Sequence, residues 1–394
     1  MFVYLDNSST TRQYDEVTDR MVNMMKEDFG NPSSLHRMGV AAERAVKEAR
    51  KAASISIGAR EDEIFFTGGG TEADNTAIFG SVYAKRRQGN KIIASAIEHP
   101  AVLEACKKLQ KDGFETEFIG VDEKGLIDLE ELKLKLSSDT VLVTVMMVNN
   151  ELGTVQPIRE IGELIKEKGG ILFHTDAVQA YGRIPIDTAN LPVDLLSISG
   201  HKIHGPKGIG ALYIRKGLHI EPYLFGGGQE SGFRSGTENT PGIAGFGIAA
   251  EKMHKTYEKR INKIESARNY LLAGIKDRIE DITINSPEEV YNPDSLPKRH
   301  VCSPSVLNVS FLGCRGEVLL HTLEQRDIYV STGAACSSRK KGSHVMAAAG
   351  LAADRIESAI RFSVSEFNTV EQMDYVLVEL KKAVGQMRTL MRKR

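Results

Sequence analysis

A lysine in a glycine-flanked turn and a carboxylate at the end of an apolar run are the first residues of this 394-residue chain that could do chemistry. Lys202 lies in SGHKIHGPKG, directly after an apolar run, where partial desolvation would lower the pKa of its amine and suit it to Schiff-base formation. Asp176 ends another apolar run, and a buried carboxylate is costly unless a cation or several donors pair with it. Taken alone, Lys202 could be a surface lysine and Asp176 a helix N-cap.

Three further segments place polar residues or glycines after apolar runs. GGGTEADN, from Gly68, opens a helical stretch whose free N–H groups, with the Thr71 hydroxyl, could hold an anion, although a plain N-cap is the alternative. It is not a P-loop, because no Lys-Ser/Thr pair follows at the required spacing. Residues 98–99 (Glu-His) and 149–151 (Asn-Asn-Glu) follow two other runs. Because ligands of parallel sheets bind beyond the carboxyl ends of the strands, these ends together predict one binding site.

Together these residues form a recognisable chemical set. They offer an anion-binding helix start, an acid for a pyridinium nitrogen, a Schiff-base lysine and a histidine, His99, to lie against a ring. Ser199 and His201, close to the lysine, could donate to a phosphate. This is what pyridoxal 5'-phosphate (PLP) requires from a protein, so we expect a PLP site.

Short apolar runs must position these residues. They occupy residues 63–67, 91–97, 140–148, 171–175, 195–199 and 210–215, and they alternate with amphipathic helical stretches. Nearly continuous Val, Ile and Leu predict strands buried on both faces, and the alternation predicts an α/β fold with a mainly parallel sheet.

The pattern changes near residue 256. A long helix over 256–280, a strand over 305–311, a helix over 316–325 and a C-terminal helix with a Thr369/Gln372 capping box are expected there. We therefore predict a large α/β domain over residues 15–255 and a smaller α+β domain from residues 1–14 and 256–394.

Composition excludes several classes of protein. Lys and Arg number 51 against 52 Asp and Glu, a net charge of −1, which argues against direct nucleic-acid binding. Four cysteines without a CxxC pair cannot build a disulfide framework. The N-terminus does not resemble a signal peptide, and the apolar runs fall short of the roughly 20 residues that a membrane span needs. We expect a cytoplasmic protein with no membrane contact.

At this point the chain resembles the cysteine desulfurases of the NifS/IscS type, within the class V, fold-type I PLP-dependent transferases. The order and spacing of the shared segments extend over nearly the whole chain. These segments are YLDNSSTT (4–11), FGNPSSLH (29–36), FTGGGTEADN (66–75), EHPAV (98–102), NNELGTVQP (149–157), HTDAVQA (174–180), SGHKIHGPKGIGALY (199–213), GGGQESGFRSGTEN (226–239), STGAACSS (331–338) and IRFS (360–363).

The resemblance implies a role for each cofactor-binding residue. Lys202 would carry the cofactor as a Schiff base, Asp176 would pair with the pyridine nitrogen, and Gln179 would contact the ring hydroxyl. His99 would stack on the ring and serve in proton transfer. Thr237 would reach the phosphate in the neighbouring subunit, which implies a homodimer. The phosphate would be held by Gly70, Thr71, Ser199 and His201.

The resemblance also implies a substrate site and a nucleophile. Asn150 and Arg361 would fix the substrate carboxylate, Arg361 through a bidentate pair, with Asn31 nearby and Asn150 also beside the cofactor. Cys336 would be the nucleophile. Its small and basic neighbours favour a thiolate over the alternative, a buried apolar cysteine. The other three cysteines are expected to be structural, with Cys314 exposed.

The implied activity is conversion of L-cysteine to L-alanine, with a persulfide formed on Cys336 and passed to a protein acceptor. That acceptor would be an iron–sulfur scaffold or a tRNA-thiolation enzyme. Another class V enzyme, an aminotransferase or a selenocysteine lyase, is the alternative, since the cofactor cradle alone does not fix the chemistry. A metal scaffold is disfavoured and no metal is expected, because Cys302, Cys314 and Cys336 are too widely spaced.

Overall fold

A seven-stranded sheet forms the centre of the larger part of the protein. The structure, a computed structural model, describes residues 1–293, 300–333 and 342–391. The strand order is β2-β8-β7-β6-β5-β3-β4. The bounds are β2 (Ile64–Thr67), β3 (Lys91–Ser95), β4 (Glu115–Ile119), β5 (Thr140–Thr144), β6 (Leu172–Asp176), β7 (Leu195–Ser199) and β8 (Gly210–Ile214).

Parallel pairing dominates this sheet. Strands β4, β3, β5, β6 and β7 pair in parallel, while β8 runs antiparallel to both β7 and β2. This confirms the predicted α/β fold with a mainly parallel sheet. The run over 140–148 was predicted as one strand, yet β5 ends at Thr144. Val145 and Met147 still donate to backbone oxygens of the β6 strand, so the apolar run continues beside β6 beyond the end of the regular ladder.

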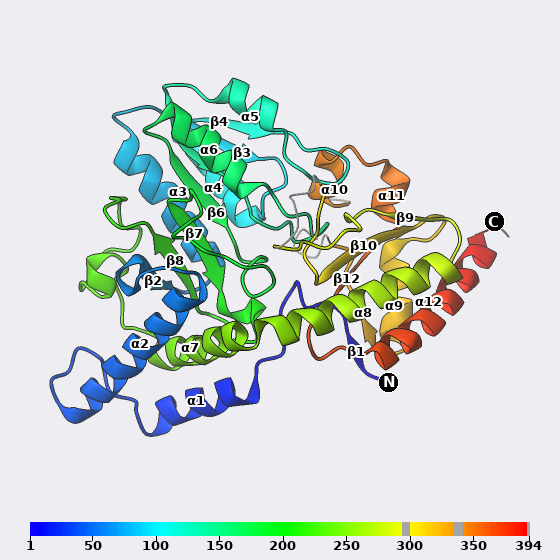
Figure 1. Cartoon of the computed structure of the whole chain (residues 1–394), viewed down its shortest axis with the longest axis horizontal. Helices are drawn as coiled ribbons and strands as arrows, with labels where there is room; N and C mark the ends of the chain where they lie inside the picture. Colours follow the sequence, from blue (N-terminus) through cyan, green and yellow to red (C-terminus); the bar gives the residue numbers. More distant parts are fainter. Residues whose placement is uncertain (294–299, 334–341, 392–394) are drawn as a thin grey trace.

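Helices cover both faces of the sheet (Figure 1). Phe173 on β6 packs in a core with α2 (Arg37–Ser56), α5 (Leu129–Lys135), α6 (Ile158–Lys168) and α7 (Thr240–Lys255). Its neighbour Leu172 packs in a second core with α3 (Gly70–Lys85) and α4 (Pro100–Lys111). Successive side chains of a strand point to opposite faces, which is why continuous apolar runs are needed here. Helix α1 (Asp15–Lys26) lies against α7.

A three-stranded antiparallel sheet organises the C-terminal part. Strand β10 (Val306–Phe311) pairs with β9 (Ile282–Ile284) and β12 (Ala359–Ser363). Helices α8 (Tyr257–Arg278), α9 (Gly316–Glu324) and α12 (Val370–Met391) share its apolar core. The short helices α10 (His344–Ala348) and α11 (Ala353–Glu357) complete this part. The Thr369/Gln372 capping box is confirmed, with bonds of 3.1 and 3.2 Å.

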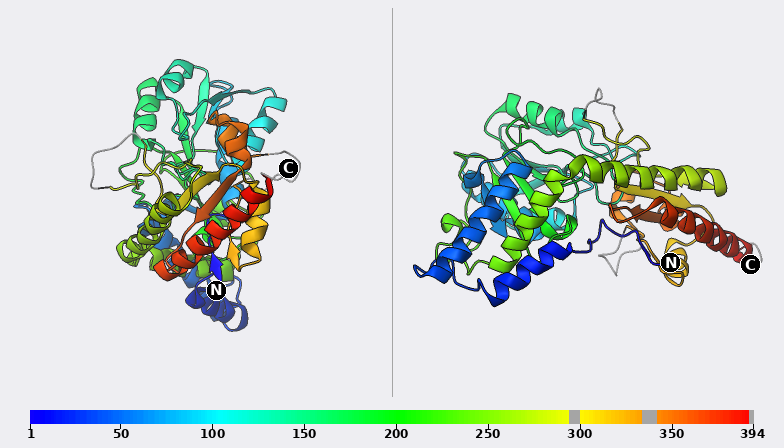
Figure 2. Two further views of the ribbon diagram at one scale, coloured as in Figure 1. Left: turned by 90° about the vertical axis from the view of Figure 1, so that its right-hand side faces the viewer. Right: turned by 60° about the horizontal axis from the view of Figure 1, so that its bottom comes forward.

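The N-terminal segment crosses from one sheet to the other. Strand β1 (Val3–Tyr4) pairs in parallel with β11 (Ile328–Tyr329) in the C-terminal part. Figure 2 shows the chain running from there to α1. On the way Asn7 donates to the carbonyl of Ser363, and Thr11 to that of His201. The proposed domain boundaries near residues 15 and 255 remain a prediction.

No helix in the described part of the chain combines the length and the apolar character needed to cross a bilayer.

Candidate active site

A cleft of about 840 Å³ opens at the carboxyl ends of β2 and β7. Residues from the N-terminal segment, the glycine turn after β2 and the turn after β7 line it. The turn after β7 is a single 3-10 turn, η2 (Gly200–Lys202). The lining residues used below are Ser9, Gly69, Gly70, Thr71, Ser199 and His201.

One end of the cleft is suited to an anion. Helix α3 begins at Gly70, and its N-cap, Gly69, has φ +147°, a conformation that favours glycine. Among the described residues no side chain caps this helix start, so its first N–H groups remain available to a ligand. His201 Nδ1 lies 3.2 Å from Thr10 Oγ1, and burial lowers the pKa of His201 to about 4, so its ring is neutral. The structure brings Gly70, Thr71, Ser199 and His201 together, as expected for a phosphate site.

The amine of Lys202 is held by the N-terminal segment. It donates to the carbonyl of Ser8 and, over 2.8 Å, to that of Ser9. Burial lowers the pKa of Lys202 to about 7, and the nearby charges of Arg361 and Arg183 act in the same direction. A large fraction of this amine is therefore neutral near pH 7, the form that attacks an aldehyde.

Asp176 is the last residue of β6, and Gln179 lies three residues further along the chain. Asp176 is 5% exposed, and its Oδ1 accepts 2.9 Å from the Val178 N–H. Burial raises the pKa of Asp176, while His99 and Lys202 favour its ionised form. Gln179 donates 2.9 Å to the Ser8 carbonyl, and its buried Oε1 has no partner among the described residues. A carboxylate and an unused amide oxygen at one strand end suit the nitrogen and the hydroxyl of a pyridoxal ring.

His99 is the N-cap of α4. Its Nδ1 accepts 3.1 Å from the Ala101 N–H, which assigns the proton to Nε2. Burial lowers the pKa of His99, which favours the neutral ring, while the nearby Asp176 acts in the opposite direction. In this form Nε2 is thus the atom of the residue that can release a proton.

Buried polar groups surround the Asp176 strand end within the sheet. His174 lies 2.8 Å from Thr144 Oγ1 and 3.0 Å from Ser197 Oγ, and Asp74 Oδ1 lies 3.7 Å from its Nε2. Burial raises the pKa of Asp74 well above its usual range and that of Glu98 to about 8. Glu98 is therefore mostly neutral near pH 7, and burial also disfavours the charged form of Asp74.

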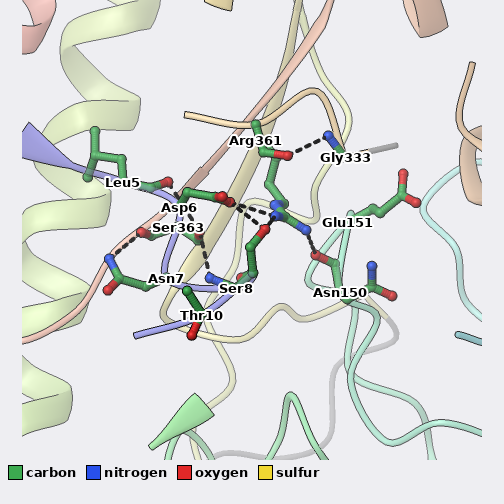
Figure 3. Close-up of polar contacts among 12 residues, drawn as sticks. Leu5, Asp6, Asn7, Ser8, Thr10, Asn150, Glu151, Gly333, Arg361 and Ser363 are labelled. Carbon is green, nitrogen blue, oxygen red and sulfur yellow. Dashed lines mark hydrogen bonds and ion pairs between the residues drawn. The ribbon is translucent and has the colours of Figure 1, made fainter. Parts of the chain in front are cut away.

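Arg361 on β12 is enclosed by three segments (Figure 3). Its Nη1 donates 2.8 Å to the Asn150 carbonyl, and its Nη2 donates 2.8 Å to both Asp6 Oδ1 and Ser9 Oγ. The guanidinium Nε and the Asn150 Oδ1 are buried without partners in the described part of the chain. The structure thus brings the two predicted carboxylate-binding residues together, and it leaves the Arg361 Nε as a donor for a ligand.

Two predicted site residues lie outside this cluster, and the position of a third is not described. Asn31 lies on the connection between α1 and α2, which is far from β12, and its Oδ1 accepts from Ser33 (Figure 1). Thr237 is exposed on the connection before α7. Cys336, with its basic neighbours, lies outside the described residues.

The prediction that Cys314 is exposed is wrong. Its side chain is buried in the core beneath α12, and the Sγ lies 4.0 Å from the Val384 carbonyl. Burial raises the pKa of this thiol. Cys106 and Cys302 are also buried, as expected for structural cysteines.

Sequence reasoning missed the N-terminal residues of the site. Asp6, Ser8 and Ser9 contact Arg361, Gln179 and Lys202, yet no role was predicted for them. The only signal was the polar run DNSSTT directly after a short apolar strand. Within the described ranges no group of three or more His, Cys, Asp or Glu side chains could hold a metal ion.

Comparisons with known proteins agree over almost the full length. The family model described as "Aminotransferase class-V" matches residues 3–376. The cysteine desulfurase IscS of Clostridium botulinum (strain Hall) is 44% identical over 389 residues, covering 98% of this chain and 96% of the relative.

Two solved structures are similar in fold and sequence. One titled "NIFS-LIKE PROTEIN" gives a TM-score of 0.90 at 38% identity and covers 98% of this chain and 100% of its own. Another, "SspA in complex with cysteine", gives 0.79 at 33% identity and covers 92% and 98%.

Proposed function

The chain belongs to the class V aminotransferase family and is a PLP-dependent cysteine desulfurase, and we propose that it converts L-cysteine to L-alanine with the sulfur retained as a persulfide on Cys336. One contact carries the proposal most directly. Lys202 and Arg361 meet at Ser9, which accepts from the lysine through its carbonyl and from the arginine through its hydroxyl. A cofactor-binding amine and a carboxylate-binding guanidinium therefore lie one residue apart, as an amino-acid substrate requires.

The residues around the cleft would hold PLP as follows. The N–H groups at the start of α3, with Thr71, Ser199 and His201, would bind the phosphate. Asp176 would pair with the ring nitrogen, Gln179 would face the ring hydroxyl, and His99 would lie against the ring. When bound, PLP supplies the electron sink that weakens the Cβ–S bond of an attached amino acid.

The chain's own groups orient the substrate and move its protons. Arg361 and Asn150 hold the carboxylate of cysteine, so that its Cβ–S bond is presented in one orientation. The neutral Lys202 amine takes a proton from the substrate and returns it, and His99 Nε2 is the second group placed for proton transfer.

Cys336 receives the sulfur. Its thiolate forms an S–S bond to the substrate sulfur as the Cβ–S bond breaks, and the electron pair left at carbon takes a proton. The sum is cysteine plus one enzyme thiol giving alanine plus one enzyme persulfide, with no external oxidant or reductant.

The remaining assignments concern location and partners. We infer a cytoplasmic homodimer in which Thr237 reaches the phosphate of the neighbouring subunit. Thr237 is exposed, and so are the large apolar side chains of Phe29, Leu35 and Phe225, Leu35 by 100%. Exposed apolar side chains of this size support a surface that a second subunit covers. Relatives named IscS support an iron–sulfur scaffold as acceptor, with a tRNA-thiolation enzyme as the other candidate. An aminotransferase is not favoured, since the named relatives are desulfurases.

Alanine and persulfide measured together test this function. We expect the PLP-loaded protein to release alanine from L-cysteine without a keto acid and to form one persulfide per chain in a single turnover. Cys336→Ala should lose both products, whereas Cys106→Ala, at a buried position on α4, should keep them. Alanine formation at the wild-type rate by Cys336→Ala would refute the assignment.

A further inference from the structure

Glu151, seven residues after the end of β5, carries a buried carboxyl group for which the proposed reaction has no role. It is 3% exposed. The Glu151 N–H donates to Asn149 Oδ1 over 2.9 Å, and the Glu151 carbonyl accepts from Asn308 Nδ2 over 3.2 Å. The backbone of this turn is therefore fixed from both sheets, and the position of the carboxyl group is well defined.

Residues on both sides of Cys336 in the sequence contact this carboxyl group. Ser343 donates its hydroxyl to Glu151 Oε2. Gly333 lies so close that a Cβ there would come within 2.8 Å of the same oxygen, and its φ of +83° also favours glycine. One side chain thus contacts the chain before and after the segment that carries Cys336.

Further contacts tie these flanking residues to the site. Ser331 exchanges backbone hydrogen bonds with Arg361, of 3.2 and 2.6 Å, and its Oγ accepts 3.1 Å from the Gly333 N–H. On the other flank, His344 Nε2 lies 3.0 Å from the carbonyl of Glu98, the residue before His99. Figure 3 shows Glu151, Gly333 and Arg361 in this neighbourhood.

From these contacts, and resting on the proposed function, we infer that Glu151 is a positioning residue for sulfur transfer, which fixes the residues flanking Cys336 against the substrate-binding strand ends. Glu151 does not touch the reacting atoms in this scheme. It acts through Ser343 and Gly333, so it should govern thiol attack and leave substrate binding unchanged.

The ionisation of Glu151 supports this role. Burial raises its pKa to about 7, while the Ser343 hydrogen bond and the charge of Arg361 act in the opposite direction. At pH 8 the carboxylate form therefore predominates, and hydrogen bonds to an ionised acceptor are stronger than neutral ones. An experiment at pH 8 examines the residue in that form.

Single-turnover persulfide formation by the PLP-loaded enzyme at pH 8 tests the inference. We expect Glu151→Gln and Ser343→Ala each to slow this step about tenfold or more, because a misplaced reacting group is costly. The double variant should be no more than about twofold slower than the slower single variant, since Glu151→Gln weakens the contact that Ser343→Ala removes together with the cap of α10. Ser343→Thr, which keeps the hydroxyl, should restore most of the rate.

L-Alanine binding provides the second readout, since this amino acid needs Lys202, Asn150 and Arg361 but no thiol. Its affinity, followed through the cofactor absorbance, should stay within about twofold of wild type in every variant. Ser358→Ala is the matched control. That buried serine donates to Asp354 in the neighbouring helix α11 and should leave both readouts unchanged.

The outcomes separate this inference from the proposed function. A wild-type rate in Glu151→Gln, additive slowing in the double variant, or alanine affinity that falls in step with the rate would each overturn the positioning role. A wild-type enzyme that makes alanine without a persulfide on Cys336 would overturn the proposed function, and the inference with it.

Discussion

Asp176 and Arg361 are both buried charged residues of the site, and the chain holds them in different ways. Asp176 ends a strand of the seven-stranded sheet, and its polar surroundings come from elements packed on or following that sheet, among them Asp74 on α3 and His99 at the start of α4. Arg361 lies on the three-stranded sheet and is held by residues 6, 9 and 150, which come from the N-terminal segment and the other sheet. The Asp176 half of the site is thus positioned mainly by the elements of one sheet, with the N-terminal segment contacting Lys202 and Gln179, while the Arg361 half depends on how separate parts of the fold meet.

The two halves also differ in how charge is balanced. Near Asp176, burial raises the pKa of Glu98 to about 8 and that of Asp74 well above its usual range, so the charged form of each carboxyl is disfavoured. Arg361 instead has an ionised counter-charge, Asp6, at 2.8 Å. Substitutions that remove charge without changing shape should therefore act differently in the two halves.

The largest effect is expected on the cofactor side. Asp176→Asn removes the charge that would stabilise the protonated ring nitrogen, and we expect kcat to fall on the order of 100-fold or more. Asp74→Asn is the matched variant, because burial already disfavours the charged form of this carboxyl and the amide has the same shape. Its kcat should stay within about threefold of wild type.

Steady-state alanine formation in both variants, with cofactor content measured alongside, checks this contrast. An equal fall in kcat in Asp74→Asn and Asp176→Asn would mean that the two buried carboxyls share one charge. The distinction between them would then be wrong.

A smaller effect, of another kind, is expected on the substrate side. Arg361→Lys keeps the charge but loses the planar donor pair, so we expect KM for L-cysteine to rise about tenfold to a hundredfold. The affinity for PLP should hardly change, because Arg361 is not among the residues expected at the cofactor. A lower PLP affinity with an unchanged KM would contradict the division of the site into two halves.

The same division explains what could be predicted from the sequence. Lys202, Asp176 and His99 each follow an apolar run, and parallel strand ends meet at one edge, so local pattern was enough to group them. The strand ends themselves were less well predicted. The run over 140–148 stays apolar beyond β5 because it continues beside β6, and hydrophobicity alone does not mark where the ladder stops.

The contacts of Arg361 could not be predicted in this way. Asp6 is separated from it by most of the chain, and no periodicity links a polar N-terminal run to a strand near the C-terminus. Cys314 was mispredicted for the same reason, because the helix that covers it comes much later in the sequence. Tertiary burial by a distant segment leaves no local pattern.

The smallest effect is expected from the counter-charge of Arg361. Asp6→Asn leaves a guanidinium that is 3% exposed without its ionised partner, although the Ser9 hydroxyl and the Asn150 carbonyl remain. Because Asp6 is itself 21% exposed, we expect the free energy of unfolding to fall by only about 1–3 kcal/mol. Asp15→Asn is the control, since Asp15 forms an exposed pair with Arg12 that contributes at most about 1 kcal/mol.

A ligand carboxylate should replace the missing charge. If Arg361 binds the carboxylate of an amino acid, L-alanine supplies the anion that Asp6→Asn has lost, and it should stabilise this variant more than it stabilises the wild type or Asp15→Asn. Thermal unfolding of the PLP-loaded proteins, with and without L-alanine, measures the difference. Equal stabilisation of all three would mean that Asp6 does not share the guanidinium with the substrate, and the Arg361 half of the site would then be held mainly by Ser9 and Asn150.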